Sequence, residues 1–355
     1  MVVKYETIAD RLLKDVLTGR LKPGKRVPSE KELAGDYEVS IQTVNKAISV
    51  LVSSGVLVRR GVQGAFVSEF IDLARLRKGR QLQIGIVYDA RVQTITDSDR
   101  VLGRLTFHLQ HLLGRDSYAW TLLSRADGDD LENAVDNLDG LVTIGDVEPA
   151  VLDAVARRRL PAVAFNRDFR DRGLGAVLIG TEAIEGLVGH LFESGHRRFL
   201  FVANDSPRQV YAIRKAAFDR AVERRGVSPR ALVIPEGRMK AEQPDAASLA
   251  VIRDCDAAFL PNDQMAIVFL HMLERCGLRV PEDLSVCGHD DTVAARHCSV
   301  PLTTVAYDLQ EAAAVIVKTL GDVVYGRAEC PLAVIPSRVV PRASSAVSRS
   351  AGGQP

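Results

Sequence analysis

Residues 29–67 read SEKELAGDYEVSIQTVNKAISVLVSSGVLVRRGVQGAFV, and this stretch decides the fold of the first part of the chain. Ser29 followed by Glu32 forms a capping box, so a helix should begin at Ser29. Another helix should follow Ser40, because its apolar residues recur at spacings of 3, 1 and 3. Two short strands around a glycine-containing turn should occupy residues 56–67.

An amphipathic helix is also predicted over residues 5–18, so three helices precede a hairpin, which is the order of a winged helix-turn-helix. In this fold, the second helix of the pair lies in the major groove of DNA and presents its N-terminal residues to base edges. We expect DNA contacts from Lys31, Ser40, Gln42, Thr43, Asn45, Lys46, Arg59, Arg60 and Gly61. Gln and Asn side chains can form two hydrogen bonds with adenine, and Lys can donate to guanine or to a phosphate. The alternative is that these residues form the solvated face of a small domain.

Length and composition restrict the class of protein. A chain of 355 residues with 46% hydrophobic and 26% charged residues predicts a globular protein of two or three domains. The absence of an apolar run of ~20 residues and of a secretory signal predicts a cytoplasmic protein without a membrane span. Residues 1–80 hold 15 basic and 9 acidic residues, whereas the rest holds 31 and 36. The net charges of +6 and −5 indicate that the N-terminal part meets a polyanion.

No cofactor is expected. The five cysteines are odd in number and include no CxxC pair, which argues against a disulfide framework and a zinc site. The seven histidines show no metal-ligand pattern, and no glycine-rich phosphate loop follows the strand predicted at residues 83–88.

From residue 83 onward, buried-type strands alternate with amphipathic helices, which predicts an α/β fold with parallel, doubly wound sheets in two lobes. The predicted strands are residues 83–88, 119–123, 140–144, 162–165, 199–202, 231–234, 257–260 and 284–286. The resulting division is a DNA-binding domain over 1–68, a linker over 69–82, an α/β domain over 83–342 and a disordered tail over 343–355.

Polar clusters follow several of these strands, where ligands bind in open parallel sheets. They are Asn166-Arg167-Asp168, Asn204-Asp205 with Arg214 on the next helix, Asn262-Asp263 and Asp290-Asp291. Carboxylates, amides and arginine can pair with each hydroxyl of a polyhydroxylated ligand. An Asn or Asp after a strand can instead be a turn or a helix N-cap, and Arg214 can instead be part of a surface ion pair.

Residues 5–67 resemble the GntR winged-helix family in three segments: LKPGKRVPSEKEL (21–33), VSIQTVNKA (39–47) and RRGVQGAFV (59–67). Members of that family often carry arginine where Ile41 and Asn45 stand in this chain. The operator of a typical member therefore cannot be transferred to this protein.

Residues 83–342 are similar to the effector domain of the LacI/GalR family, which is itself similar to periplasmic sugar-binding proteins. The similar segments include DGLV (139–142), ESGHRR (193–198), PND (261–263), GLRVPEDLSVCGHDD (277–291) and PLTT (301–304). The resemblance implies two lobes joined by three crossovers, with residues 307–325 returning to the first lobe. It places Asn166, Arg214, Asn262, Asp290 and Tyr307 at effector-contacting positions. Residues 88–100 lack the aromatic pair usual in that family, which leaves the identity of the ligand open.

Together these patterns predict a one-component transcriptional repressor that binds double-stranded operator DNA as a homodimer and responds to a small molecule, a sugar. Arabinose-responsive repressors have this domain combination, which suggests a pentose. We do not expect an enzyme. Two alternatives remain: a sugar-binding module without linked DNA regulation, and a sugar-acting enzyme that uses Asp263 and Asp290 as acid and base.

Overall fold

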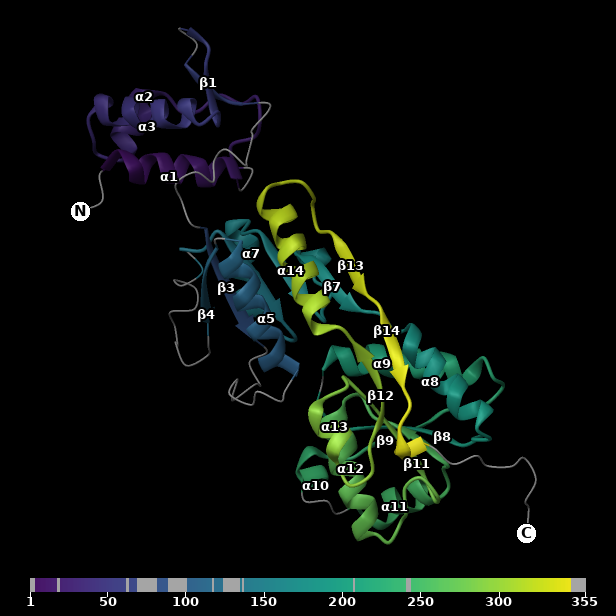
Figure 1. Cartoon of the computed structure of the whole chain (residues 1–355). Helices are drawn as coiled ribbons and strands as arrows, with labels where there is room; N and C mark the ends of the chain where they lie inside the picture. The colour runs from purple at the N-terminus through teal and green to yellow at the C-terminus, as the bar shows by residue number, and fades with distance from the viewer. Residues whose placement is uncertain are drawn as a thin grey trace.

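The computed structural model describes residues 4–17, 20–61, 64–68, 82–88, 101–116, 118–123, 135, 137–206, 208–240 and 244–345. These residues form an N-terminal helical domain and two α/β lobes (Figure 1). The predicted linker lies outside the described residues except for Leu82, as does the segment 89–100. The exact domain boundaries therefore remain a prediction.

The described residues of the N-terminal domain form α1 (Lys4–Leu17), α2 (Glu30–Asp36), α3 (Ile41–Ser53), β1 (Leu57–Arg59) and β2 (Ala65–Val67). Ser29 caps α2, because its hydroxyl accepts from the backbone N–H of Glu32 at 3.2 Å. The Glu32 carboxylate accepts in return from the backbone N–H of Ser29 at 2.7 Å. The apolar face of α3 is buried, and β1 pairs antiparallel with β2. The predicted winged helix-turn-helix is confirmed.

The first lobe, called lobe 1, contains a parallel sheet in the order β13-β7-β6-β5-β3-β4. Its strands are β3 (Gln83–Tyr88), β4 (Ala119–Leu123), β5 (Gly140–Ile144), β6 (Ala162–Phe165), β7 (Gly175–Ile179) and β13 (Leu332–Ile335). Its helices are α5 (Val101–Arg115), α7 (Pro149–Arg158) and α14 (Leu309–Val324). A short 3₁₀ turn, η3 (Arg170–Arg172), precedes β7.

The second lobe, called lobe 2, repeats this arrangement in the order β14-β12-β11-β10-β8-β9. Its strands are β8 (Phe199–Ala203), β9 (Arg230–Val233), β10 (Ala257–Phe259), β11 (Ser285–His289), β12 (Thr303–Tyr307) and β14 (Ser337–Val340). Its helices are α8 (Glu182–Glu193), α9 (Gln209–Glu223), α10 (Glu236–Lys240), α11 (Ala246–Arg253), α12 (Asp263–Arg275) and α13 (Val293–His297). The β12–β14 pair is antiparallel and the other pairs are parallel, so the predicted doubly wound parallel architecture is confirmed.

Three segments cross between the lobes, as the resemblance implied: β7 to α8, β12 to α14, and β13 to β14. Ser337, at the start of β14, is hydrogen-bonded to the crossover between β7 and α8: its hydroxyl donates to the carbonyl oxygen of Gly180 at 2.7 Å. The backbone N–H of Ser337 donates to the Glu182 carboxylate at 2.6 Å. These hydrogen bonds connect two crossovers to each other at the junction of the lobes.

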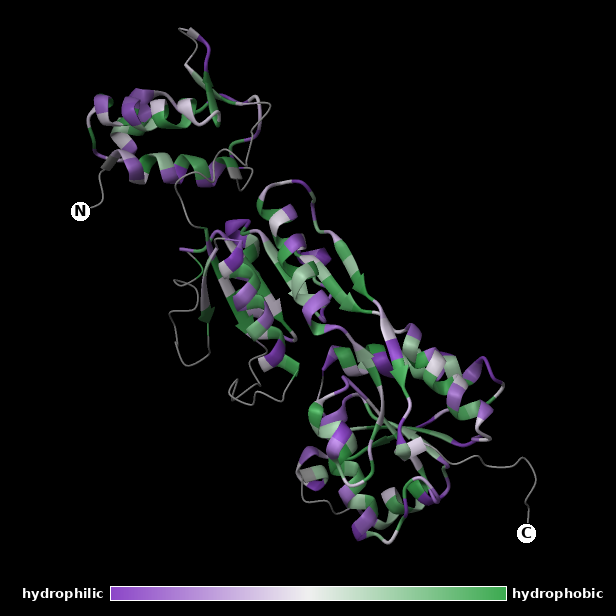
Figure 2. Ribbon diagram, viewed as in Figure 1, coloured by the Kyte–Doolittle hydropathy of each residue, from purple (hydrophilic) through white to green (hydrophobic). Residues whose placement is uncertain are grey.

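The eight predicted strands are present with end shifts of a few residues, but the prediction omitted β7, β12, β13 and β14. All four lie next to a crossover. The two late strands, β13 and β14, are largely unburied and so lack the continuous apolar run of a central strand. Figure 2 shows the hydrophobic residues concentrated in the central strands and the inner sides of the helices.

The segment predicted as a disordered tail begins with an ordered turn, η4 (Ala343–Ser345). Ser344 is fully buried, and its hydroxyl accepts from the backbone N–H of Thr303 at 2.8 Å. The Ser345 hydroxyl lies 2.7 Å from the Thr303 hydroxyl and 3.2 Å from His190 Nε2. Residues 343–345 therefore belong to lobe 2, because small buried hydroxyls here pair with strand and helix groups. The rest of the predicted tail lies outside the described residues.

Candidate functional site

The N-terminal end of α3 presents the residues predicted to contact DNA. Ser40 is its N-cap, and its hydroxyl accepts from the backbone N–H of Thr43 at 3.2 Å. The Ser40 and Thr43 hydroxyls are also 2.8 Å apart, so both groups have a capping role in the free protein. Gln42 is exposed beside them. Ile41, at the first position of α3, is 49% exposed, which leaves a large apolar side chain on this surface.

Two further side chains of α3 have partners within the domain. The Asn45 carbonyl oxygen accepts from Nη2 of Arg59 at 2.6 Å, which joins α3 to the hairpin. Lys46 places its ammonium nitrogen 4.1 Å from the ring centre of Tyr5 on α1, a cation–π contact. Lys46 nevertheless remains exposed.

The hairpin carries the predicted wing residues. The guanidinium of Arg60 lies 5.0 Å from the ring centre of Phe66, and the backbone N–H of Arg60 donates to the carbonyl of Gly64. Gly61 has a φ of +54°, in the left-handed region that favours glycine at a turn. Lys31 is exposed on α2. All nine predicted residues thus lie on α2, α3 or the hairpin, and their contact with DNA remains a prediction.

A cavity of about 340 Å³ lies at the junction of the two lobes. Lobe 1 and the first crossover contribute Asn166, Leu178, Ile179, Gly180, Thr181, Glu182 and Val334, and lobe 2 contributes Val210, Ile213, Arg214 and His289. The structure therefore brings Asn166 and Arg214 to one cavity, although 48 positions separate them in the sequence. Asn166 follows β6 with a φ of +58°, a conformation that asparagine tolerates better than most residues.

Arg214 is the buried cation of this cavity, with 6% of its side chain exposed. Its Nη2 donates to Oδ1 of Asp290 at 3.2 Å, and its Nη1 donates to the carbonyl oxygen of Pro261. Tyr307 places its hydroxyl 3.3 Å from the same carboxylate oxygen of Asp290. Three of the predicted effector residues, Arg214, Asp290 and Tyr307, therefore form one hydrogen-bonded cluster.

The protonation states in this cluster follow from burial and charge. Burial alone would raise the pKa of Asp290, but the charge of Arg214 and the donated hydrogen bonds hold that pKa below its ordinary value. Burial lowers the pKa of His289 to about 4, with Arg214 adding to the effect, so the imidazole is neutral at pH 7. Since a carboxylate only accepts, neutral His289 must carry its proton on Nδ1, which lies 2.9 Å from Asp290.

Asn262 and Asp263 have structural partners. Asn262 is the N-cap of α12: its amide oxygen accepts from the backbone N–H of Met265, and its amide nitrogen donates to the Tyr211 hydroxyl at 2.9 Å. Asp263 is fully buried and accepts from the Thr304 hydroxyl at 2.6 Å. Burial raises the pKa of Asp263 to about 7, with the nearby charge of Asp290 adding to the effect. Of the predicted effector residues, Asn166 and Arg214 line the cavity, whereas Asn262, Asp290 and Tyr307 lie outside its lining.

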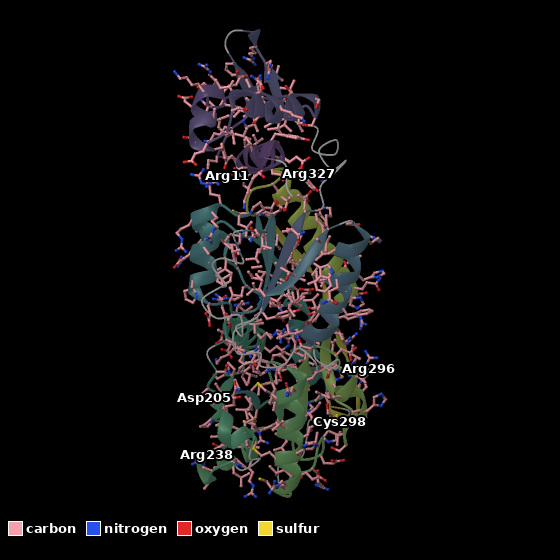
Figure 3. All side chains as sticks on the ribbon, turned by 90° about the vertical axis from the view of Figure 1, so that its left-hand side faces the viewer. Arg11, Asp205, Arg238, Arg296, Cys298 and Arg327 are labelled. Carbon is pink, nitrogen blue, oxygen red and sulfur yellow. The ribbon has the colours of Figure 1, made fainter. Side chains whose placement is uncertain are left out.

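A second crevice of about 580 Å³ lies on the other side of α9. Its polar lining comes from Asp146 and Arg167 of lobe 1 and from Asn204, Ser206, Arg208, Gln209, Tyr211 and Lys215 of lobe 2. Arg167 and Asp146 form an ion pair at 2.8 Å. Figure 3 shows Asp205, which follows β8, and Arg296, on α13, in the part of lobe 2 nearer to lobe 1. The strand-end clusters could be located from the sequence, but Asp146, Glu182 and the neighbouring helix residues that line these spaces could not.

Among the described residues, no group of three or more His, Cys, Asp or Glu side chains could hold a metal ion. None of the helices in this part of the chain is long and apolar enough to cross a membrane.

Two stretches of the chain match known protein families. Residues 4–67 match the family of bacterial regulatory proteins called the gntR family, and residues 188–345 match the periplasmic binding protein-like domain. The chain is 24% identical to the arabinose metabolism transcriptional repressor of Halalkalibacterium halodurans over 334 residues, which are 86% of this chain and 85% of that protein. It is 26% identical to the repressor of the same name from Geobacillus stearothermophilus, over 87% of each chain.

Partial matches and solved structures agree with these relatives. The repressor CytR of Escherichia coli is 29% identical over 175 residues, which are 48% of this chain and 51% of that protein. The fold is that of a LacI family transcriptional regulator from Enterococcus faecium with bound ribose, at a TM-score of 0.62 and 20% identity over 76% of this chain and 100% of that chain. The prediction of a protein that is not an enzyme is confirmed by these relatives, which are transcriptional repressors. This chain is therefore a transcriptional regulator in which residues 4–67 match the gntR family of bacterial regulatory proteins and residues 188–345 match the periplasmic binding protein-like domain, and its relatives over most of its length are transcriptional repressors.

Proposed function

We propose that this regulator binds a sugar in the cavity between its lobes and that binding changes its affinity for operator DNA in the cytoplasm. The observation that carries this proposal is the placement of Arg214, which lies buried in the cavity and is held by Asp290. A buried guanidinium with a fixed carboxylate beside it offers donors and acceptors to ligand hydroxyls. The volume of about 340 Å³ is near the lower end of the roughly 300–1,000 Å³ of small-molecule sites.

The proposed ligand class is a pentose. The relatives that align with most of the chain are arabinose metabolism repressors, and a structure with the same fold holds ribose. The effector contacts proposed are Asn166, Arg214, Asn262, Asp290 and Tyr307. Such a site would be selective, because an analogue that lacks a hydroxyl would leave buried polar groups of the protein without a hydrogen-bond partner.

The proposed mechanism is linkage between two orientations of the lobes. A ligand that touches both lobes stabilises one orientation, and it shifts DNA affinity only by its differential affinity for the two states. We propose a homodimer, because two-fold operators present two half-sites to two DNA-binding domains. The three crossovers with their Ser337 hydrogen bonds are the segments about which the lobes can rotate.

A thermal-shift screen with arabinose, ribose, xylose, hexoses and sugar phosphates tests the ligand. A ligand at about 100 times its dissociation constant adds roughly 2.7 kcal/mol, which moves the melting temperature by several degrees in a domain of this size. DNA binding to the region upstream of the gene is then titrated with and without the hit, and sedimentation reports the dimer.

The proposal predicts a hit that changes operator affinity in the wild type and fails to do so in Arg214→Ala. A sugar that binds without changing DNA affinity would favour the sugar-binding module instead. If no sugar raises the melting temperature, the proposal of a sugar ligand is refuted. Binding of the protein to operator DNA would then still support its role as a transcriptional regulator.

A further inference from the structure

The side chains of Arg59 and Asn45 form a direct link between the hairpin and α3. Nη2 of Arg59 donates to Oδ1 of Asn45 at 2.6 Å, and the same nitrogen lies 3.6 Å from a carboxylate oxygen of Glu30 at the start of α2. Arg59 is thus held by groups from two helices. The pair lies on the surface that carries the residues proposed to contact DNA.

Chemistry fixes the orientation of the Asn45 amide in this pair. A guanidinium has N–H donors and no acceptor, so the amide atom that faces Arg59 must be the oxygen. The amide nitrogen of Asn45 therefore lies on the other arm of the side chain, with its two N–H groups available.

This orientation changes what Asn45 can read. A free asparagine pairs with adenine by accepting from N6 and donating to N7 of the base. Here one of the two lone pairs of the oxygen already accepts a short, charge-assisted hydrogen bond, which leaves the oxygen a single acceptor site, whereas both N–H groups of the Asn45 amide remain and Arg59 adds further donors beside them. Guanine is the base that presents two acceptors, O6 and N7, in the major groove.

We infer that Asn45 and Arg59 act as one donor-rich reading unit that selects guanine over adenine at the base pair facing Asn45. Arg59 is a positioning residue in this unit, because it occupies one acceptor site of the Asn45 oxygen and fixes the orientation of the amide. The inference rests on the proposed placement of the α3 N-terminus in the major groove, and it replaces the adenine preference that the sequence suggested for Asn45 by a preference for guanine.

Selection of bound sites from random DNA by the full-length protein tests this inference. Wild type should enrich guanine at one position of each half-site, and Asn45→Ala should lose the preference at that position. Arg59→Ala should shift the same position toward adenine, because the amide oxygen becomes available. A good bidentate contact discriminates by roughly 5- to 150-fold, so the guanine-to-adenine ratio should fall by a factor in that range.

Arg20→Ala is the matched control, because Arg20 is an exposed arginine of the same domain that pairs with Asp15 at 3.1 Å and is not among the predicted DNA contacts. It should leave the preference at the Asn45 position unchanged. The inference is overturned if wild type selects adenine at the position that Asn45→Ala affects. It is also overturned if Arg59→Ala weakens binding to all sequences equally, as loss of a phosphate contact would. Failure of wild type to enrich any sequence would refute DNA reading itself, and thermal melting would confirm that each variant is folded.

Discussion

Replacing Arg214 by alanine tests both the stability and the response of the effector domain. Arg214 and Asp290 are 3.2 Å apart, and their side chains are 6% and 13% exposed. Removing one partner of a buried ion pair leaves an uncompensated charge and costs about 3–5 kcal/mol. Asp290 would keep its hydrogen bonds with His289 and Tyr307, so we expect the lower end, about 3 kcal/mol.

The free energy of unfolding is measured by urea denaturation followed by far-ultraviolet circular dichroism. The double variant Arg214→Ala/Asp290→Asn should recover part of the lost stability, because it removes the stranded charge. Arg279→Ala is a matched control, since Arg279 pairs with Asp283 on the surface with 71% of its side chain exposed, and should cost about 0–1 kcal/mol.

The same variants report on function. Arg214→Ala should retain operator binding through the N-terminal domain while losing the effect of the ligand on that binding. Two results would refute the reasoning: a loss of stability no larger than that of Arg279→Ala, or equal potency of the ligand on wild type and Arg214→Ala.

Three further predictions concern other sites. Lys46→Ala and Arg60→Ala should each weaken DNA binding and reduce its salt slope by about one, as measured by binding at several salt concentrations; unchanged slopes would remove both residues from the interface. The pKa of His289 falls from 6.5 to about 4 on folding, so the unfolded chain takes up this proton first, and the contribution of His289 lowers the free energy of unfolding by up to about 3 kcal/mol as the pH falls from 6.5 to 4. Asp263, whose pKa burial raises to about 7, acts in the opposite direction, so the test is the difference in free energy of unfolding between wild type and His289→Gln, which urea denaturation should show changing by about that amount over this pH range. Ser29→Ala should destabilise α2 by about 1 kcal/mol, seen as faster amide exchange in α2 and not in α12.

Much of the fold could be predicted because it is encoded by local patterns. The capping box at Ser29, the apolar spacing in α3 and the continuous apolar runs of the central strands each act over a few residues. Exposure does not explain why the prediction omitted β7 and β12, which are largely buried, whereas β13 and β14 lack such a local pattern. Strands such as β13 are stabilised by pairing with distant segments and carry exposed side chains, so their sequence lacks a clear period.

In the candidate cavity, too, some features could be predicted from local sequence and others depend on tertiary contacts. Polar residues after strands could be located from the sequence, because the carboxyl ends of parallel strands form one edge. Their roles could not be separated, since Asn262 and Asp290 both follow buried strands. In the folded chain Asn262 caps α12, whereas Asp290 pairs with Arg214. Glu182 had no signal of its own, because its role depends on Ser337 from a late crossover.

The sequence by itself determined the domain types and their order, the regular elements of the N-terminal domain and the chemical types available for recognition. These properties depend on residue identity and short spacing. The tertiary structure alone decided which of those groups meet: Arg214 with Asp290, and Asn45 with Arg59. The physical reason is that hydrogen bonds and ion pairs act over about 3 Å, a separation that the packing of distant segments sets and that spacing along the chain does not encode.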